Sequence, residues 1–357
     1  MKILQVIDTL EAGGAERMAL NYANALAGKV EESHLCCTRR EGVLKDKVSP
    51  DVPYLFLEKS GTFDFRAFQK LAEYIDKNKI TIVHAHSSSW FLVTLIKIFR
   101  RRSLKIVWHD HYGNSEFLKK RPKKALQFFS GYFNGIISVN KNLQSWALEN
   151  LRCRNVKIFN NFISENNFKR PSAEKLKGNN SDFKIICVAN LRQQKDHYTL
   201  LKAFKIIDQK IPASLHLVGY DPDSAYSRKL KEAFKNSSEN GSIFYYGEQP
   251  DIIVFLHEAD LGVLSSRSEG LPLALLEYAG AGLPVVVTNV GECSRVVGKY
   301  GKLVASGNPS QLAEAVVKYY NNEKKRKVDA AKLQDSVLKE FSEKAVIRKI
   351  LKFYQEL

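Results

Sequence analysis

The chain has 357 residues, 44% of them hydrophobic, and a formal net charge of +17. This length exceeds what one compact domain usually holds, so it predicts two domains. The charge favours anionic partners, namely nucleic acid, acidic lipid or phosphorylated small molecules. The five cysteines are odd in number and include no C-x-x-C pair. This argues against a disulfide framework or a zinc site and predicts a cytoplasmic protein.

Short β-branched runs alternate with longer helical patterns along the whole chain. This alternation is typical of βα units that build a mostly parallel sheet. In the first half it predicts strands at Ile3–Ile7, His34–Cys37, Tyr54–Leu57, Thr81–His84, Lys105–Trp108, Ile136–Val139 and Val156–Ile158. Helices are predicted between them at Ala15–Ala27, Phe65–Asn78, Ser89–Arg100 and Asn142–Asn150.

A polar, Asn-rich stretch from Asn160 to Asp182 interrupts this alternation. Strands are predicted beyond it at Phe183–Val188, Ser214–Val218, Ile243–Tyr246, Leu261–Leu264 and Pro284–Thr288. Helices are predicted at Tyr198–Asp208, Ala225–Phe234, Pro272–Ala279, Gln311–Tyr320, Lys324–Glu340 and Lys344–Gln355. We therefore expect an N-terminal domain over residues 1–162, a linker over 163–182, a C-terminal domain over 183–341, and a final helix over 342–357 that can return to the N-terminal domain. Two doubly wound halves predict a ligand cleft at the carboxyl ends of their strands.

Two turns after predicted strands could hold a phosphate group. Gly13 and Gly14 precede a helix, where a backbone without side chains can approach an anion closely. A tight strand-to-helix turn is the alternative. Arg192 and Lys195 follow the strand that ends at Val188, and both side chains suit phosphate oxygens. A solvated loop in a basic protein is the alternative for this pair.

The third candidate is the turn from Ser265 to Pro272, which follows the strand Leu261–Leu264. Pro272 suits the first turn of a helix, so backbone N–H groups of Gly270 and Leu271 would lie beside a helix N-terminus. Glu269 in the loop and Glu277 in the helix could accept hydrogen bonds from two sets of sugar hydroxyls. The alternative is that Glu269 interacts with the helix dipole while Glu277 is a surface residue.

The stretch from Leu261 to Glu292 resembles the signature of retaining GT-B glycosyltransferases of family 4, in which an E-x7-E motif lies between a strand and a helix. Here the motif runs from Glu269 to Glu277 and is followed by Ala-Gly-Ala-Gly-Leu-Pro. Further segments match the family in order along most of the chain: Gly13-Gly14-Ala15-Glu16, Ile82-Val83-His84-Ala85-His86, Asn160-Asn161-Phe162-Ile163, Leu217-Val218-Gly219 and Tyr246-Gly247.

Four positions depart from the family pattern. Asn190 stands where the family usually carries an arginine, five residues before its diphosphate lysine. Asn161 and Ser164 replace a glycine and an acid of the interdomain segment, and Arg295 stands where many relatives carry an acid. The resemblance still implies the GT-B fold, with two Rossmann-like domains whose parallel sheets face each other across a central cleft.

The resemblance also implies the donor site. Glu277 would bind ribose hydroxyls, Glu269 would bind the donor sugar, and Lys195 would bind the diphosphate, with Arg192 substituting for the missing arginine. The implied donor-binding set is Gly13, Gly14, Arg192, Lys195, Gly219, Gly247, Glu269, Gly270, Leu271, Leu273 and Glu277. The implied catalytic set is Glu269, Lys195, Arg192 and His111.

Histidines mark the acceptor or sugar side of the implied site. The family's cleft histidine matches His111 best, with His109 as a close rival, and His84 and His86 end the preceding predicted strand. The alternative for His111 is a structural hydrogen bond at a strand end. UDP is the expected donor nucleotide because it is the commonest in the family.

The implied chemistry is transfer of a sugar with retention at the anomeric carbon. Negative charge grows on the departing diphosphate, and Lys195, Arg192 and helix amides would stabilise it in the transition state. The acceptor hydroxyl would attack from the face of the leaving group and give its proton to the phosphate. Glu269 as a covalent nucleophile is the alternative. No metal and no cofactor are expected.

Two basic segments predict contact with a membrane and hence a lipid-linked acceptor. Residues 100–102 follow an apolar helix, and residues 119–124 precede an apolar stretch. Basic residues beside bulky apolar ones suit an anionic membrane surface. We therefore expect a peripheral protein on the inner face of the membrane, with a glycan or polyprenyl-diphosphate-linked acceptor, as in bacterial capsule or lipopolysaccharide synthesis. Ordinary solvated helix faces are the alternative.

Three other functions remain open at this point. A nucleic-acid-binding protein would agree with the charge, but no zinc finger, K-homology loop or RNP-like motif is present, so no nucleic acid is expected. A nucleotide-sugar epimerase or a phosphorylase would share the GT-B fold. An inactive, donor-binding relative would not need both Glu269 and Glu277.

Overall fold

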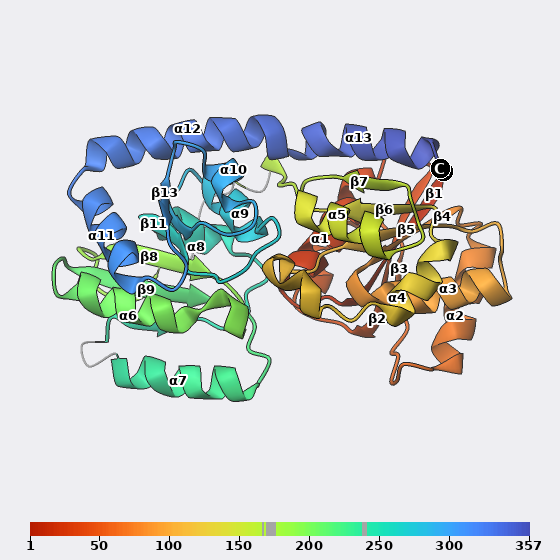
Figure 1. Ribbon diagram of the computed structural model, residues 1–357, viewed down its shortest axis with the longest axis horizontal. Helices are drawn as coiled ribbons and strands as arrows, with labels where there is room; N and C mark the ends of the chain where they lie inside the picture. The colour runs from red at the N-terminus through yellow and green to blue at the C-terminus, as the bar shows by residue number, and fades with distance from the viewer. Residues whose placement is uncertain (166–167, 169–175, 238–240) are drawn as a thin grey trace. The chain divides into compact units, whose positions relative to one another are not determined.

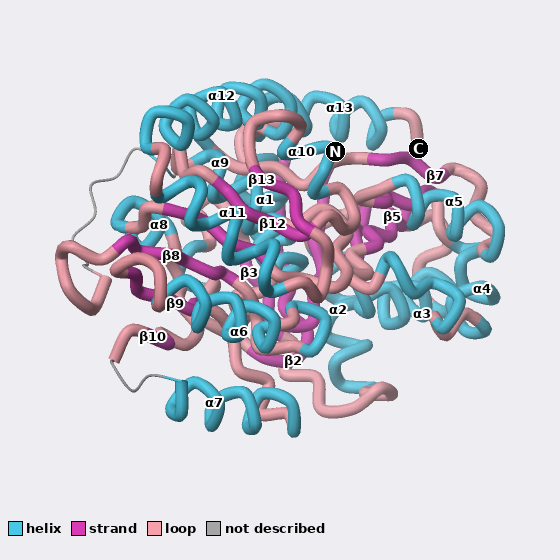
Figure 2. Tube along the Cα trace, turned by 60° about the vertical axis from the view of Figure 1, so that its left-hand side comes forward, coloured by secondary structure: helices cyan, strands magenta, loops and turns pink. Residues whose placement is uncertain are grey.

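The computed structural model describes residues 1–165, 168, 176–237 and 241–357, so the predicted linker 163–182 lies partly outside the described residues. The chain forms two compact units: Met1–Asn161 with Glu343–Leu357, and Phe162–Ser342. In each of them, strands alternate with helices along the chain (Figures 1 and 2). Among the described residues, no helix combines the length and the apolarity needed to cross a bilayer.

The first unit contains a seven-stranded sheet in which all paired strands are parallel. The strand order is β3-β2-β1-β4-β5-β6-β7, so the direction of winding reverses between β1 and β4. The strands are β1 (Lys2–Thr9), β2 (Glu32–Arg40), β3 (Tyr54–Phe56), β4 (Ile82–His86), β5 (Lys105–Asp110), β6 (Gly135–Ser138) and β7 (Val156–Ile158).

Helices cover both faces of this sheet. They are α1 (Gly14–Leu26), α2 (Phe65–Lys77), α3 (Trp90–Phe99), α4 (Lys124–Phe129), α5 (Lys141–Asn150) and α13 (Glu343–Gln355), with short 3-10 helices η1 (Lys45–Lys47), η2 (Ser87–Ser89), η3 (Ser115–Lys120) and η4 (Ser130–Tyr132). Asp64 and Asn140 cap α2 and α5 by accepting hydrogen bonds from backbone N–H groups in the first turn.

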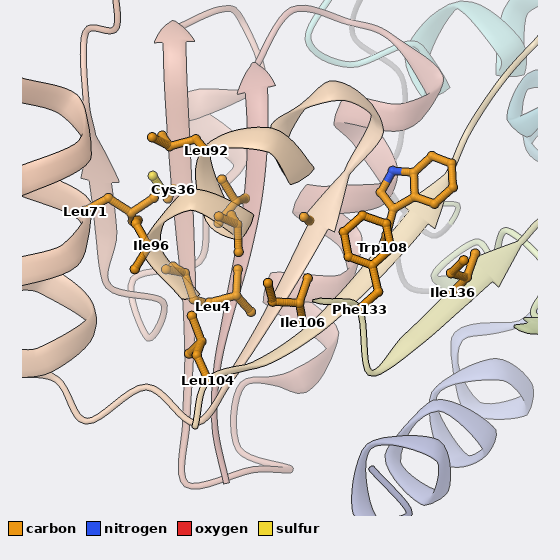
Figure 3. Close-up of a cluster of buried hydrophobic side chains, with 14 of the residues drawn as sticks. Leu4, Cys36, Leu71, Leu92, Ile96, Leu104, Ile106, Trp108, Phe133 and Ile136 are labelled. Atoms are coloured by element: carbon orange, nitrogen blue, oxygen red, sulfur yellow. The ribbon is translucent and has the colours of Figure 1, made fainter. Parts of the chain in front are cut away.

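Strand alternation gives the two faces of this sheet different chemistry. Leu4, Ile106 and Trp108 point to the face that packs against α2–α5, where Trp108 contacts Phe133 with ring centroids 5.9 Å apart (Figure 3). The intervening residues of β1 and β4 point to the opposite face, which α1 and α13 cover, and they include polar side chains such as Gln5.

The second unit contains a six-stranded parallel sheet of order β10-β9-β8-β11-β12-β13, in which the winding reverses between β8 and β11. The strands are β8 (Phe183–Val188), β9 (Ala213–Val218), β10 (Ile243–Tyr245), β11 (Leu261–Leu264), β12 (Val285–Thr288) and β13 (Lys302–Val304). The helices are η6 (Gln193–Lys195), α6 (His197–Asp208), α7 (Ala225–Ser237), α8 (Ile253–Glu258), α9 (Leu273–Gly280), α10 (Cys293–Val297), α11 (Pro309–Tyr320) and α12 (Glu323–Phe341).

The core of the second unit lies between the sheet and helices α6, α7 and α11. Ile185, Leu215 and Val263 from the strands pack there against Phe204 and Leu312 from the helices. Helix α12 contacts α9, where the Gln334 side chain of α12 donates a hydrogen bond to the carbonyl of Gly280 in α9 at 2.8 Å. The alternation predicted from the sequence is confirmed, because apolar strands need helices on both faces to bury them.

Besides the 3-10 helices, four short elements escaped the prediction. They are α4, α8, α10 and β13, with three to six residues each. The three helices hold less than two turns of helical periodicity and β13 has only three residues, so the sequence pattern cannot distinguish them from loops. Pro272 also differs from its prediction, because it caps α9 as the residue before the helix rather than opening its first turn.

Candidate functional site

Two of the predicted donor residues, Lys195 and Glu269, lie where the winding of the second sheet reverses. The loops after β8 and β11 carry Lys195 and Glu269, and the two strands are neighbours. Loops at such a reversal diverge to opposite sides of a sheet and leave room for a ligand at the carboxyl ends. The sequence prediction that these two loops act together is therefore consistent with their placement.

Lys195 and Glu269 form an ion pair. The Lys195 Nζ donates to Glu269 Oε1 at 2.6 Å, and the Ser266 Oγ donates to the same oxygen at 2.6 Å. The Glu269 side chain is 5% exposed and that of Lys195 is 20% exposed. A carboxylate this deeply buried needs such donors, because an unpaired charge away from water is costly.

Further bonds tie the two loops together at their base. The Arg267 Nε donates to Asp196 Oδ2 at 2.8 Å, and the Arg267 backbone N–H donates to the Gln194 carbonyl at 2.7 Å. Ser265 Oγ donates to the Lys195 carbonyl at 3.0 Å. Asp196, with φ of 47°, also caps α6. These bonds hold Lys195 and Glu269 in place before any ligand arrives.

Glycines permit the close approach of the surrounding strand ends. A Cβ on Gly219 would lie 2.2 Å from the carbonyl oxygen of Ala189, and one on Gly291 would lie 2.2 Å from that of Glu269. The carbonyl of Gly247, whose φ is 69°, accepts a hydrogen bond from Gly219 at 2.8 Å. Backbone packing thus requires glycine at position 219, and the positive φ favours glycine at position 247, whatever contact the two make with a ligand.

Glu277 is buried, so the alternative that it is a surface residue is wrong. It lies in α9 with 8% exposure. Its neighbour Tyr278 is fully buried, and the Val188 N–H donates to the Tyr278 hydroxyl at 2.6 Å. Gly270, Leu271 and Leu273 before and within the same helix are buried as well.

Arg192 and Asn190 take different positions in the loop after β8. Arg192 is exposed and precedes η6. Asn190 accepts a hydrogen bond from the Tyr220 N–H at 3.1 Å. The residue that replaces the family's arginine therefore joins two loops, and the carbonyl of Arg192 accepts a hydrogen bond from the Lys195 N–H at 2.9 Å.

Four histidines come together at the carboxyl ends of β4 and β5 in the first unit. His84, His86 and His109 are completely buried, and only His111 retains partial exposure. The ring centroids of His109 and His111 are 3.9 Å apart, and those of His84 and His86 are 4.3 Å apart. Of the predicted acceptor-side histidines, only His111 therefore presents surface to a ligand.

Burial keeps these histidines neutral. Loss of hydration lowers the pKa of His84, His86 and His109 well below the usual histidine value, and it lowers the pKa of His111 to about 3. The neighbouring imidazoles add to this effect for the first three. A neutral imidazole can donate from one nitrogen and accept at the other.

The Gly13–Gly14 turn opens α1. Gly13 is its extended N-cap and Gly14 its exposed first residue. Gly14 would have open space around a Cβ. The Glu16 carboxylate folds back on this turn, since a Cβ on Gly13 would lie 2.0 Å from Glu16 Oε2. Binding of an anion at this turn stays a prediction.

Arg121 is a correction to the predicted membrane-facing basic segment. Its guanidinium forms a bidentate bond with Asp110 at 2.7 and 2.8 Å, and it lies over the rings of Tyr112 and Trp146. Its side chain is only 8% exposed. Arg121 thus holds the loop after β5, which carries His111, instead of facing a membrane.

An acidic pair also escaped the sequence analysis. Asp221 and Asp223 have Asp-x-Asp spacing in the loop after β9. Asp221 pairs with Lys231 at 2.5 Å, and Asp223 pairs with Arg228 at 3.3 Å. Each carboxylate is thus neutralised by a lysine or arginine of α7.

Each half of the chain matches a family model of known proteins. Residues 12–166 match the family model described as Glycosyltransferase Family 4, and residues 168–332 match that described as Glycosyl transferases group 1. The crystal structure of Anabaena HepE in complex with UDP and glucose superposes with a TM-score of 0.81 over 100% of both chains, at 16% identity. The shared fold is that of GT-B glycosyltransferases, with two Rossmann-like domains.

Relatives identified by sequence agree with these matches. The O-antigen biosynthesis glycosyltransferase WbnH of Escherichia coli is 25% identical over 304 residues, which cover 84% of each chain. The UDP-Gal:alpha-D-GlcNAc-diphosphoundecaprenol alpha-1,3-galactosyltransferase of Escherichia coli is 26% identical over 299 residues, which cover 78% of this chain and 76% of that protein.

Proposed function

We propose, from the premise that this chain belongs to the group 1 and family 4 glycosyltransferases, that it transfers a sugar from a UDP-sugar to a lipid-linked glycan with retention at the anomeric carbon. The observation that carries the proposal is the buried Glu269 carboxylate held by Lys195 at the reversal point of the second sheet. This pair combines a cation for a diphosphate with an acceptor for sugar hydroxyls.

The donor would engage the second unit through these side chains. Lys195 leaves Glu269 to bind the diphosphate, and the Glu269 carboxylate accepts hydrogen bonds from the sugar hydroxyls in exchange. Glu277 binds the ribose hydroxyls, and the backbone N–H groups of Gly270 and Leu271 face the phosphate. Arg192 is an exposed cation four residues after β8 and can fold onto the same diphosphate.

Transfer breaks the bond between sugar C1 and the diphosphate oxygen, whose electron pair stays on the phosphate. Lys195 stabilises this charge more strongly in the transition state than in the bound donor. The acceptor hydroxyl forms the new bond to C1 on the same face and gives its proton to the departing phosphate. The step needs no metal or cofactor.

Two similar proteins support UDP as the nucleotide of the donor. HepE was crystallised with UDP and glucose, and the similar galactosyltransferase is named for a UDP-galactose donor. The name of that galactosyltransferase also gives a diphosphoundecaprenol-linked acceptor. An acceptor of this type is anchored in a membrane, so it would require the protein to work at an anionic surface.

Exposed aromatic and basic side chains of the first unit support a contact with an anionic membrane. Phe117 and Phe128 are 49% and 53% exposed. The exposed lysines near them in the chain are Lys119, Lys120, Lys123 and Lys124. Exposed aromatic side chains next to lysines suit the headgroup region of an anionic membrane. We propose that these residues form the membrane contact.

A thermal-shift panel of UDP-, GDP- and ADP-sugars tests the donor. A ligand at one hundred times its Kd should stabilise the wild type by about 2.7 kcal/mol, and we expect this from a UDP-sugar. Glu277→Gln should lose the response because it removes the acceptor for ribose hydroxyls. Glu314→Gln, which alters an exposed residue of α11, is the matched control. No response of the wild type to any nucleotide sugar would overturn the donor assignment.

Product analysis with a labelled donor then identifies the reaction. Label moving to a glycan acceptor supports transfer, whereas inversion at C2 or release of a sugar phosphate would identify an epimerase or a phosphorylase. The anomeric configuration of the transferred sugar, read by NMR, tests retention.

A further inference from the structure

The histidine cluster of the first unit arises from strand alternation and strand pairing together. His84 and His86 are two residues apart in β4 and therefore share a face. Residues His86 and His109 are partners in the β4–β5 ladder, and Gln5 is the partner of His84 in the β1–β4 ladder. The sheet thus gathers these imidazoles on one face under α1 and α13.

Several nitrogens of this cluster lack hydrogen bonds. Among the described residues, His84 Nε2 and both ring nitrogens of His109 are buried without a partner. Leaving one such group unpaired costs about 1–3 kcal/mol, so three in one place are unusual for a core. A neutral imidazole has one nitrogen lone pair, so His84 Nε2 and one nitrogen of His109 can each give a lone pair to a bound ligand.

Other side chains already orient the rings in the way that metal sites require. Gln5 Oε1, which can only accept, lies 2.8 Å from His86 Nε2, so His86 carries its proton there and presents a lone pair at Nδ1. The Tyr354 hydroxyl lies 2.6 Å from His84 Nδ1, so Nε2 is the remaining nitrogen of that ring. Bonds to the outer nitrogen of a ligating histidine are the usual support of a metal site.

We propose that His84, His86 and His109 bind a divalent transition-metal ion of the zinc class, with one ring nitrogen from each residue. Their ligand atoms all lie within 4.8 Å of one another. Zn–N bonds of about 2.0–2.1 Å in a tetrahedron need nitrogens roughly 3.4 Å apart, so small side-chain movements would close the site. Imidazole is a preferred ligand of zinc, copper and nickel ions.

His111 completes the site and gives access to it. Its Nε2 lies 3.0 Å from His86 Nδ1, and this hydrogen bond would be replaced by two bonds to the ion. Because His111 is the one partly exposed member of the four, the ion can enter from its side. The bound ion would link the carboxyl ends of β4 and β5 to the start of the loop after β5. The proposed transfer chemistry in the second unit needs no metal.

Zinc titration of tag-free, chelator-treated protein tests the site. We expect calorimetry to give one Zn²⁺ per chain, and thermal unfolding to shift upward by several degrees. His84→Asn keeps a donor near Tyr354 but removes Nε2, and His109→Asn removes one free nitrogen. Each should weaken Zn²⁺ binding on the order of 100-fold. The control is His216→Asn in the second unit, because both nitrogens of His216 have partners, Ser214 and Tyr246.

X-ray absorption on the zinc-loaded wild type gives a second measurement that needs no variant. At least three imidazole ligands support the proposal, and fewer than three overturn it. The absence of stoichiometric Zn²⁺ binding overturns it too, as does equal binding by His84→Asn, His109→Asn and the control, since that result would indicate adventitious surface binding. None of these readouts depends on sugar transfer, so they leave the proposed function untouched.

Discussion

At the residue scale, the Lys195–Glu269 ion pair dominates the candidate donor site. A buried carboxylate and its lysine hold each other in place, and Ser266 supplies a second donor to the same oxygen. A diphosphate would offer Lys195 more negative charge than Glu269 does, so donor binding can exchange one partner for the other. This exchange would release Glu269 toward sugar hydroxyls only when a donor is present.

Replacement of the lysine tests this account. Lys195→Met should lower kcat by about 10²–10³, the loss seen when one donor to a developing anion is removed. Steady-state kinetics with the donor identified by thermal shift measure it. Lys202→Met, on an exposed position of α6, should remain at the wild-type rate. If kcat stays within threefold of wild type in Lys195→Met, Lys195 does not stabilise the leaving group.

At the element scale, the spacing between β11 and α9 determines where Glu277 lies. Gly262 of β11 contacts the Tyr278 ring of α9, since a Cβ there would lie 2.5 Å from Tyr278 Cδ2. The Tyr278 hydroxyl in turn accepts the Val188 N–H of β8. Because Gly262 has no side chain, the Tyr278 ring can pack against β11 while its hydroxyl bonds to β8, and α9 is thereby held to both strands.

Gly262→Ala should reduce the free energy of unfolding by about 1–3 kcal/mol, because the added methyl group overpacks against Tyr278. Urea denaturation measures the change. Gly61→Ala is the control, since its nearest neighbour would be 3.8 Å from the added Cβ. Equal stability of Gly262→Ala and wild type would show that α9 can shift without cost.

At the scale of the whole molecule, the excess of 55 basic over 38 acidic residues gives the chain its charge of +17. Charge by itself selects no partner, but its position beside exposed aromatic residues in the first unit favours a membrane. Arg121 shows that not every basic residue of that segment takes part, because its charge is neutralised in the interior.

Vesicle flotation tests the membrane contact. The wild type should float with vesicles that contain phosphatidylglycerol, and 0.5 M salt should weaken this binding because it screens the charges. Alanine at Lys119, Lys120, Lys123 and Lys124 should reduce binding by about 10²–10³, at about 1 kcal/mol per lysine. Alanine at four exposed lysines of the second unit (Lys202, Lys205, Lys210 and Lys229) is the charge-matched control. Equal loss in both variants would show that net charge, not this surface, binds lipid.

The sequence predicted the elements that have strong periodicity. The strands Phe183–Val188 and Leu261–Leu264 were predicted with the bounds that the structure has, since uninterrupted apolar runs mark buried parallel strands. The motif from Glu269 to Glu277 placed one acid in a loop and one in the following helix, as observed. These features depend on neighbours along the chain, which a sequence displays directly.

Partners far apart in the chain were decided by tertiary structure alone. The sequence contains His-x-His twice, at 84–86 and 109–111, but only the β4–β5 pairing brings the four rings together and buries three of them. Arg121 likewise finds Asp110 through the fold of a loop, and nothing in its basic surroundings indicates burial. The sequence by itself determined which βα units form and where their glycine-containing turns lie, because local periodicity and turn chemistry decide both. Only the tertiary structure decided which polar side chains lose contact with water, since burial depends on what other segments bring to the same place.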